Sequence, residues 1–239
     1  MYIAPCLRGT SDKKEITNLC DEFLHIDETP EANIIMCCSG NNCIRKSVTC
    51  IAILSKESYE IYSAIYANKN IPNEAAIHAE IFLINDIKLR KHLTHDATLT
   101  LYLTFQPCHF SGGHYKTSCF SCTESILQFY LKHLKPKNIK LVIKFGYIYR
   151  AHWTNSEEKY TQRINNAIEG LYILLINNIQ LQPIDECDHK ILYRFCSEQI
   201  KKDWDCGVFD ELIQKRKQLT IFLKNFLQNL NLNTCIVCT

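Results

Sequence analysis

Long apolar runs are missing from this sequence of 239 residues, and so are the features of a secretory leader. No window approaches the roughly 18 consecutive apolar residues that a membrane-spanning helix needs. The first residues, Met1 to Arg8, lack the basic and apolar regions of a signal peptide. We therefore expect an intracellular protein, in the cytoplasm or the nucleus, that makes no contact with a membrane.

Glycine and proline are scarce, with 7 and 6 copies, and neither charge sign dominates. Because 46% of the residues are hydrophobic, the chain can bury a substantial core, which excludes disorder and collagen-like architectures. The formal net charge is only +2, so total charge neither favours nor excludes an acidic partner. Any basic surface must therefore be local.

Cysteine is present in excess, with 14 copies. This number is too low for a small disulfide scaffold, yet high for a chain in a reducing compartment. It raises the question of which thiols have a chemical role.

The order of the predicted elements indicates one α/β domain without linkers or internal repeats. Hydrophobic spacing predicts helices over 12–24, 77–93, 122–134, 157–177, 190–201 and 209–230, and strands over 48–55, 59–67, 98–105, 139–145 and 179–184. The first two strands are expected to form an antiparallel hairpin. The last two can lie parallel, because a helix of about 20 residues separates them. We predict a three-layer α/β fold in which about six helices flank a mixed five-strand sheet, with one domain over 1–230 and a short tail over 231–239.

Histidine and cysteine residues occur where predicted elements begin or end. His78 and Glu80 open a predicted helix, Cys108 follows a predicted strand, and Cys119 and Cys122 precede or begin the next helix. Zinc takes imidazole and thiolate ligands, and catalytic zinc sites leave one position for water, so one histidine and two cysteines suffice. Glu80 would then move protons between the activated water and a substrate.

Each of these motifs alone is expected by chance in a chain of this composition, and Cys235 and Cys238 form a second C-x-x-C. The order and placement of His78, Glu80, Cys108 and Cys122 carry the information, because together they match the signature of zinc deaminases.

The pattern resembles the AID/APOBEC-like family of zinc-dependent polynucleotide cytidine deaminases, over most of the chain. Residues 77–82 are similar to the family's helix with its zinc histidine and catalytic glutamate, and residues 122–130 to the segment after its second zinc cysteine. Residues 203–210 resemble the beginning of its last helix. Around His78, the lamprey cytidine deaminases are the most similar members.

The resemblance implies an enzyme that converts cytosine to uracil in single-stranded DNA or RNA, with a role in immunity. The sequence does not determine the oligomeric state, and we favour a monomer. It implies Zn²⁺ on His78, Cys108 and Cys122, and Glu80 as the catalytic proton shuttle during attack on C4 of cytosine. The substrate-binding residues that it implies are Asn68, Ala79 through its backbone, Phe105, Gln106, Tyr147, Tyr149, Arg150 and His152.

The sequence departs from the family at the cysteines, because three of them compete for two thiolate positions. Cys108 keeps the Pro-Cys position after a strand, whereas Cys119 keeps the i, i+3 spacing to Cys122. We favour Cys108, with Cys119 as the alternate ligand. A second zinc on Cys108, His109, His114 and Cys119 is a further alternative.

A basic stretch without acidic residues runs from Glu124 to Glu157. Its cations are Lys132, Lys135, Lys137, Lys140, Lys144 and Arg150. A solvated surface is the alternative interpretation, but aromatic residues surround Arg150 at the carboxyl end of a predicted strand, where α/β sheets bind ligands. Because stacking on aromatic side chains requires accessible bases, we expect this stretch beside the active site, where it would bind a single strand.

Three other functions remain open. The chain could deaminate free cytidine or deoxycytidine or their nucleotides, it could be a zinc-stabilised nucleic-acid-binding module without turnover, or its target could be adenine. The other cysteines are interpreted as buried or free thiols.

Overall fold

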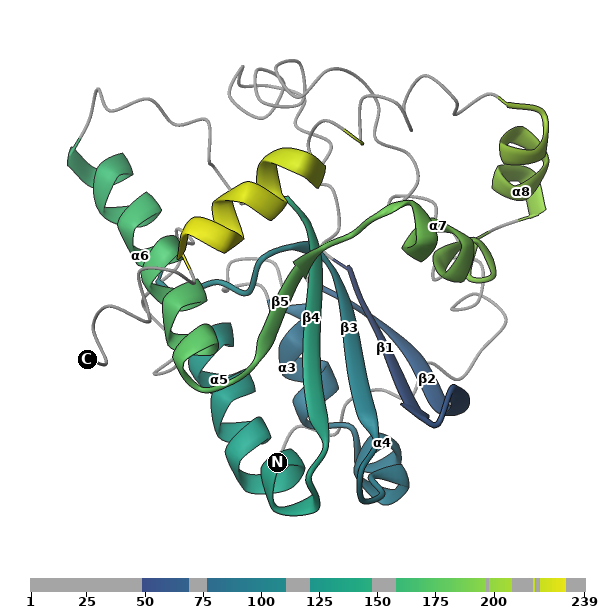
Figure 1. Cartoon of the computed structure of the whole chain (residues 1–239), viewed down its shortest axis with the longest axis horizontal. Coiled ribbons are helices and arrows are strands. Elements are labelled where there is room, and N and C mark those ends of the chain that lie inside the picture. Colours follow the sequence, from purple (N-terminus) through teal and green to yellow (C-terminus); the bar gives the residue numbers. More distant parts are fainter. Residues whose placement is uncertain are drawn as a thin grey trace.

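A five-strand mixed sheet forms the centre of the protein. The computed structural model describes residues 49–68, 77–110, 121–147, 158–196, 198–207, 217 and 220–230. The strands are β1 (Thr49–Lys56), β2 (Tyr59–Ala67), β3 (Thr98–Phe105), β4 (Lys140–Tyr147) and β5 (Gln180–Pro183), in the order β2-β1-β3-β4-β5 (Figure 1). β1 is antiparallel to β2 and β3, whereas β3, β4 and β5 are parallel. The predicted mixed sheet and the parallel pairing of its last two strands are confirmed.

The hairpin between β1 and β2 closes through Glu57 and Ser58, whose φ angles are 50° and 69°. Two consecutive residues with positive φ are typical of the two-residue turns whose twist matches that of paired strands. The expected antiparallel hairpin is therefore confirmed.

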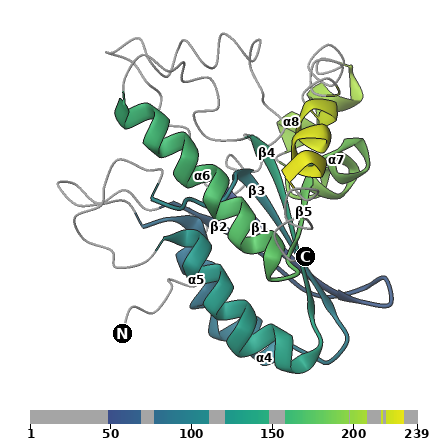
Figure 2. The ribbon, with the colours of Figure 1, turned by 60° about the vertical axis from the view of Figure 1, so that its left-hand side comes forward.

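Six α-helices accompany the sheet in the described residues. They are α3 (Ala79–Ile84), α4 (Ile87–His92), α5 (Cys122–Phe129), α6 (Glu158–Ile176), α7 (Glu186–Tyr193) and α8 (Glu198–Asp205), and residues 220–230 form a further helical segment. Figure 2 shows α5 and α6 on one side of the sheet and α7 and α8 on the other. Each side has its own apolar core, as expected for a three-layer domain.

The helix predicted over 77–93 is divided into α3 and α4 at Asp86. Asp86 caps α4 by accepting a hydrogen bond from the Lys88 N–H at 2.7 Å, and its Oδ2 accepts hydrogen bonds from the hydroxyls of Tyr62 and Tyr66, each at 2.6 Å. A side chain that satisfies a new helix start competes with continuation of the previous helix, which explains the break.

Two other predicted helices differ from the structure. The segment after Phe129 winds as a π-helix (Tyr130–Leu134) and then a 3-10 turn, because Pro136 has no N–H with which to continue the α-helical ladder. The continuous helix over 190–201 is wrong: the chain turns between α7 and α8, where Cys196 is buried in the core on that side of the sheet and Phe195 packs against it.

The helix predicted over 12–24, the tail over 231–239 and most of 209–219 lie outside the described residues. Within the described part, no helix is both long and apolar enough to cross a membrane.

Candidate metal centre

His78 and Glu80 lie at the start of helix α3. His78 is the N-cap residue, with extended backbone (φ −75°, ψ 152°), and its side chain makes no capping hydrogen bond. Asn68, just after β2, replaces that cap: its Oδ1 accepts a hydrogen bond from the Ala79 N–H at 2.8 Å. Because the first N–H groups of a helix have no partner within it, Asn68 stabilises the start of α3 and leaves the His78 ring available for other contacts.

Cys108 follows β3, and Cys122 is the first residue of α5. A reciprocal capping box sets the start of α5: Ser121 Oγ accepts from the Glu124 N–H at 3.1 Å, and the Glu124 carboxylate accepts from the Ser121 N–H at 3.0 Å. The Thr123 N–H donates to the Cys108 carbonyl at 3.0 Å. These hydrogen bonds hold the backbone of both cysteines at one place, although 13 residues separate them in sequence.

His109 and Gly170 reinforce this arrangement, and the sequence did not reveal either role. The buried His109 ring places Nδ1 3.0 Å from Ser121 Oγ, so side chains also connect the residue after Cys108 to the residue before Cys122. On α6, a Cβ at Gly170 would lie 2.5 Å from the Cβ of His109. A lone glycine inside a strongly predicted helix was the available signal for this close approach.

The three side chains predicted as metal ligands come together. His78 Nδ1 lies 3.1 Å from Cys122 Sγ and 3.4 Å from Cys108 Sγ, and the three donor atoms all lie within 4.8 Å of one another. A tetrahedral zinc ion with ordinary bond lengths keeps a nitrogen and a sulfur ligand about 3.6 Å apart. The observed spacing is therefore close to what zinc requires.

Mutual contacts set the protonation of these groups. Hydrogen bonding from Cys122, opposed by burial and assisted by His78, lowers the pKa of the Cys108 thiol to about 4. Its hydrogen bond with Cys108 raises the pKa of His78 to about 9, although burial acts in the opposite direction. The hydrogen bond to Cys108, together with burial, raises the pKa of Cys122. A thiolate stabilised beside two protonated ligands is a group that a cation can bind by displacing protons.

Glu80 is buried next to the cluster, with 3% of its surface exposed. Burial raises the pKa of its carboxyl to about 7, and the positive charge of His78 opposes this effect. The Oε2 atom is buried and has no hydrogen-bond partner among the described residues. Because such an atom is costly in a folded protein, its presence fits a site that holds a metal and water.

The other predicted site residues are distributed around this end of the sheet. Phe105 and Tyr147 are paired at the ends of β3 and β4. Gln106 is buried just before the residues around Cys108, which we call the cysteine turn. The Ala79 N–H, which the resemblance assigns to the nucleotide, bonds to Asn68. Cys119, His114, Tyr149, Arg150, His152 and Trp153 lie outside the described residues, as does the side chain of Tyr147.

The predicted location of the basic stretch is wrong for its lysines, whereas Arg150 lies outside the described residues. Parallel pairing places Lys140 opposite Thr98 at the amino ends of β4 and β3, whereas Cys108 follows their carboxyl ends. Lys132, Lys135 and Lys137 precede β4 and share this remote end, and even Lys132 lies about 15 Å from Cys122 along the helical run that contains both. Lys144 is half-way along the strand and forms an ion pair with Asp188 at 2.7 Å.

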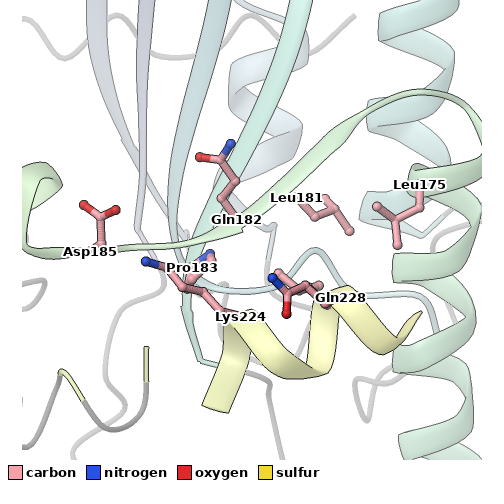
Figure 3. A pocket seen from close by; sticks show the side chains of 8 residues that line it. Leu175, Leu181, Gln182, Pro183, Asp185, Lys224 and Gln228 are labelled. Atoms are coloured by element: carbon pink, nitrogen blue, oxygen red, sulfur yellow. The ribbon is translucent and has the colours of Figure 1, made fainter. Parts of the chain in front are cut away.

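A cavity of about 380 Å³ lies elsewhere, beside edge strand β5 (Figure 3). Its lining residues come from α6, β5, the N-cap of α7 and the helical segment 220–230: Leu175, Leu181, Gln182, Pro183, Asp185, Lys224, Leu227 and Gln228. None of the predicted site residues lines this cavity.

No protein-family model matches the sequence, and no curated protein matches it. Among solved structures, the chain is similar to the dCMP deaminase from the cyanophage S-TIM5, whose crystal structure contains dCMP and dUMP. The TM-score is 0.33 at 15% sequence identity, over 70% of this chain and 97% of that chain. Because a TM-score this low does not establish a common fold, the architecture rests on the sheet order and packing described above.

Proposed function

We propose that this protein is a zinc-dependent deaminase that hydrolyses cytosine to uracil in single-stranded DNA or RNA. The observation that carries the proposal is the unpartnered Oε2 of Glu80, buried beside a His78, Cys108 and Cys122 cluster. A structural zinc site is closed by four protein ligands, and it does not need a buried carboxylate beside it. A hydrolytic site needs both an open position and a proton carrier.

Three side chains of this site would hold the zinc ion: His78, Cys108 and Cys122. When bound, zinc supplies a Lewis acid that makes water a nucleophile near neutral pH. Glu80 would take one proton from the attacking water at its carboxylate and deliver it to the ring nitrogen of cytosine, and would then carry the second water proton from the new C4 hydroxyl to the amine, which leaves as ammonia. A carboxyl whose pKa is raised to about 7 suits this work, because it can both accept and release a proton near neutral pH.

Single-stranded nucleic acid as the substrate rests on the sequence resemblance and on Tyr147. The backbone of Tyr147 ends β4 opposite Phe105, so the segment that follows it starts at the same end of the sheet as the cysteines. Aromatic side chains in that segment would stack on a base that is already unpaired.

Free cytidine nucleotides are the second candidate substrate, and the location of the basic stretch favours them. Four of the lysines that indicated a polynucleotide lie at the other end of the sheet, and Lys144 is paired with Asp188. Turnover of dCMP and cytidine, compared with that of a cytosine-containing oligonucleotide at equal cytosine concentration, distinguishes the two substrates.

The proposal is tested by incubating the zinc-loaded protein with a single-stranded oligonucleotide that contains one cytosine, and by measuring uracil through excision and strand cleavage. We expect Glu80→Gln to lower the rate at least about a hundredfold while zinc content stays unchanged. Glu169→Gln, at an exposed carboxylate on α6, is the matched control and should keep full activity. Equal uracil formation with and without Glu80, or none on any cytosine substrate with zinc bound, contradicts the proposal.

A further inference from the structure

Two segments far apart in sequence bring their basic side chains together at the amino ends of β3 and β4. Helix α4 contributes Arg90 and Lys91, and the π and 3-10 turns after α5 contribute Lys132, Lys135 and Lys137. We call these five residues the basic pole. Figure 1 shows α4 and the lower end of α5 at this same end of the sheet.

Three hydrogen bonds hold the two segments against each other. Lys137 Nζ donates to the Leu93 carbonyl at 2.7 Å, and the Asp96 N–H donates to the Lys137 carbonyl at 3.1 Å. Asn138 Nδ2 donates to Asp96 Oδ1 at 2.7 Å. The loop after α4 and the 3-10 turn therefore form one surface, so their charges are neighbours in space although they are far apart in sequence.

The field at this surface is positive, because among the described residues the five cations outnumber the two nearby carboxylates, those of Asp86 and Asp96. Among the described residues, none of the five forms an ion pair with a carboxylate. Of the two nearby acids, Asp86 accepts hydrogen bonds from Tyr62 and Tyr66, and Asp96 accepts from Asn138. Burial, together with the charges of Arg90, Lys132 and Lys137, lowers the pKa of His133 between the two segments.

Local helix stability accounts for only part of this charge. Arg90 and Lys91 lie in the last turn of α4, where cations interact favourably with the helix dipole. Lys132 and Lys135 lie in the last turns of the π-helix and the 3-10 helix, so they gain from a helix dipole too, but both are exposed and add to the repulsion between the two segments. An excess of like charges held together lowers stability, and a bound polyanion would relieve that cost.

We propose that the basic pole binds the phosphate backbone of nucleic acid, at the end of the sheet opposite the candidate metal centre. No exposed Phe, Tyr or Trp side chain accompanies the lysines among the described residues of these segments, since Phe129 and Tyr130 are buried, and the exposed His92 ring already stacks on Tyr62. Base stacking is therefore not offered, and contact with phosphates does not depend on sequence or on unpaired bases. The choice of nucleic acid over an acidic peptide rests on the proposed function.

The basic pole thus differs from the metal centre in the substrate that it accepts. The metal centre requires an unpaired cytosine, whereas the basic pole accepts duplex as well as single strands. Bound at the pole, a nucleic acid would raise the local concentration of its single-stranded regions near the site without being a substrate itself.

The test measures fluorescence anisotropy of a labelled 20-base-pair DNA duplex with the full chain, from about 50 to 300 mM salt. We expect the double variant Lys132→Gln/Lys135→Gln to bind on the order of tenfold more weakly at 100 mM salt and to reduce the salt slope by nearly two. The matched control Lys190→Gln/Lys202→Gln removes two exposed lysines from α7 and α8 and should bind like the wild type.

The inference is overturned if the wild type does not bind the duplex at 50 mM salt, or if both double variants lose the same affinity. It is also overturned if polyglutamate of equal charge displaces the duplex as well as unlabelled duplex does. The Glu80→Gln protein should bind the duplex normally, so a failure of deamination would not contradict duplex binding by the basic pole. Conversely, a protein that does not bind the duplex can still deaminate a short oligonucleotide, so the two proposals can fail independently.

Discussion

The carboxyl end and the amino end of strand β3 carry different chemistry. At the carboxyl end, the side chains of His78, Cys108, Cys122 and Glu80 are largely shielded from solvent. His78 Nδ1 lies 3.1 Å from Cys122 Sγ and 3.4 Å from Cys108 Sγ. At the amino end, the cations of the basic pole are mostly exposed. The eight residues of β3 separate these two regions. Electrostatic interactions in the metal centre are strengthened by burial, whereas the exposed cations of the basic pole attract anions through solvent over about a Debye length.

Residues that are close in sequence can therefore lie at opposite ends of the sheet. Lys140 and Tyr147 belong to the same strand, yet the first lies beside the basic pole and the second beside the cysteine turn. A strand rises about 3.3 Å per residue, so seven residues are enough to remove a lysine from an active site. The following predictions test how far the two ends are independent.

Loss of a metal ligand should have the largest effect, and only at the carboxyl end. We expect Cys108→Ser and Cys122→Ser to lose bound zinc and deaminase activity, because a serine hydroxyl is a far poorer zinc ligand than a thiolate. Cys119→Ser should keep one zinc per chain. Zinc stoichiometry and duplex binding are measured on the same preparations. Loss of zinc in Cys119→Ser but not in Cys108→Ser would show that Cys119, rather than Cys108, is the second thiolate ligand. Loss of duplex binding in a variant that has lost zinc would show that the metal centre and the basic pole are not independent.

Substitution of Lys144 should lower the stability of the fold, because this lysine contacts neither the metal centre nor the basic pole. Its ion pair with Asp188, of which only 2% of the side chain is exposed, fixes α7 against β4. We expect Lys144→Met to lower the free energy of unfolding by about 2 to 3 kcal/mol, because Asp188 would keep a buried charge without its cation. Urea unfolding is compared with that of Lys140→Met, an exposed lysine on the same strand. Equal stability of the two variants would contradict this role.

Gly170→Ala should disturb the carboxyl end from behind. The added Cβ would lie 2.5 Å from His109 Cβ and 2.9 Å from Thr123 Oγ1, so the turn that holds Cys108 has to move. We expect a loss of about 1 to 2 kcal/mol in stability and about tenfold in activity, with normal duplex binding. Glu169→Ala, at the exposed neighbouring position, is the control. A more stable and fully active Gly170→Ala would show that helix propensity outweighs the contact.

Acid should weaken the anchor of α4, with the smallest effect of the four. Burial opposes ionisation of Asp86, but hydrogen bonds from Tyr62 and Tyr66 outweigh it and lower the pKa of the carboxyl below its usual value. A lowered folded-state pKa stabilises the protein above the unfolded pKa near 4, and this contribution is lost as pH falls through the folded value.

The measurement for Asp86 is the melting temperature between about pH 6 and pH 2.5. Asp86→Asn keeps an N-cap acceptor for α4 but cannot ionise. We expect it to melt below the wild type at pH 6, with the gap closing as the pH falls. A constant gap over the whole range would rule out a contribution from this titration.

The sequence determined much of the fold because its local signals agreed with each other. Alternating residues predicted strand 98–105 with the bounds of β3, and a long intervening helix predicted parallel β4 and β5. It failed where a side chain formed contacts with distant partners. Asp86 divides a helix because Tyr62 and Tyr66 lie on a neighbouring strand, and no local pattern contains that information.

Residue types, their placement at element ends and the family resemblance together predicted His78, Cys108 and Cys122 as zinc ligands, and the structure brings these three side chains together. Tertiary structure alone decided three other features. It brought His109 and Gly170 behind the cysteine turn, it paired Lys144 with Asp188, and it moved Lys132 to Lys140 to the far end of the sheet. The physical reason is that the residue type fixes what a side chain can bind or protonate, and this can be seen in the sequence. The distance between two side chains depends on strand direction and on which helix face packs against which neighbour, and only the tertiary structure determines it.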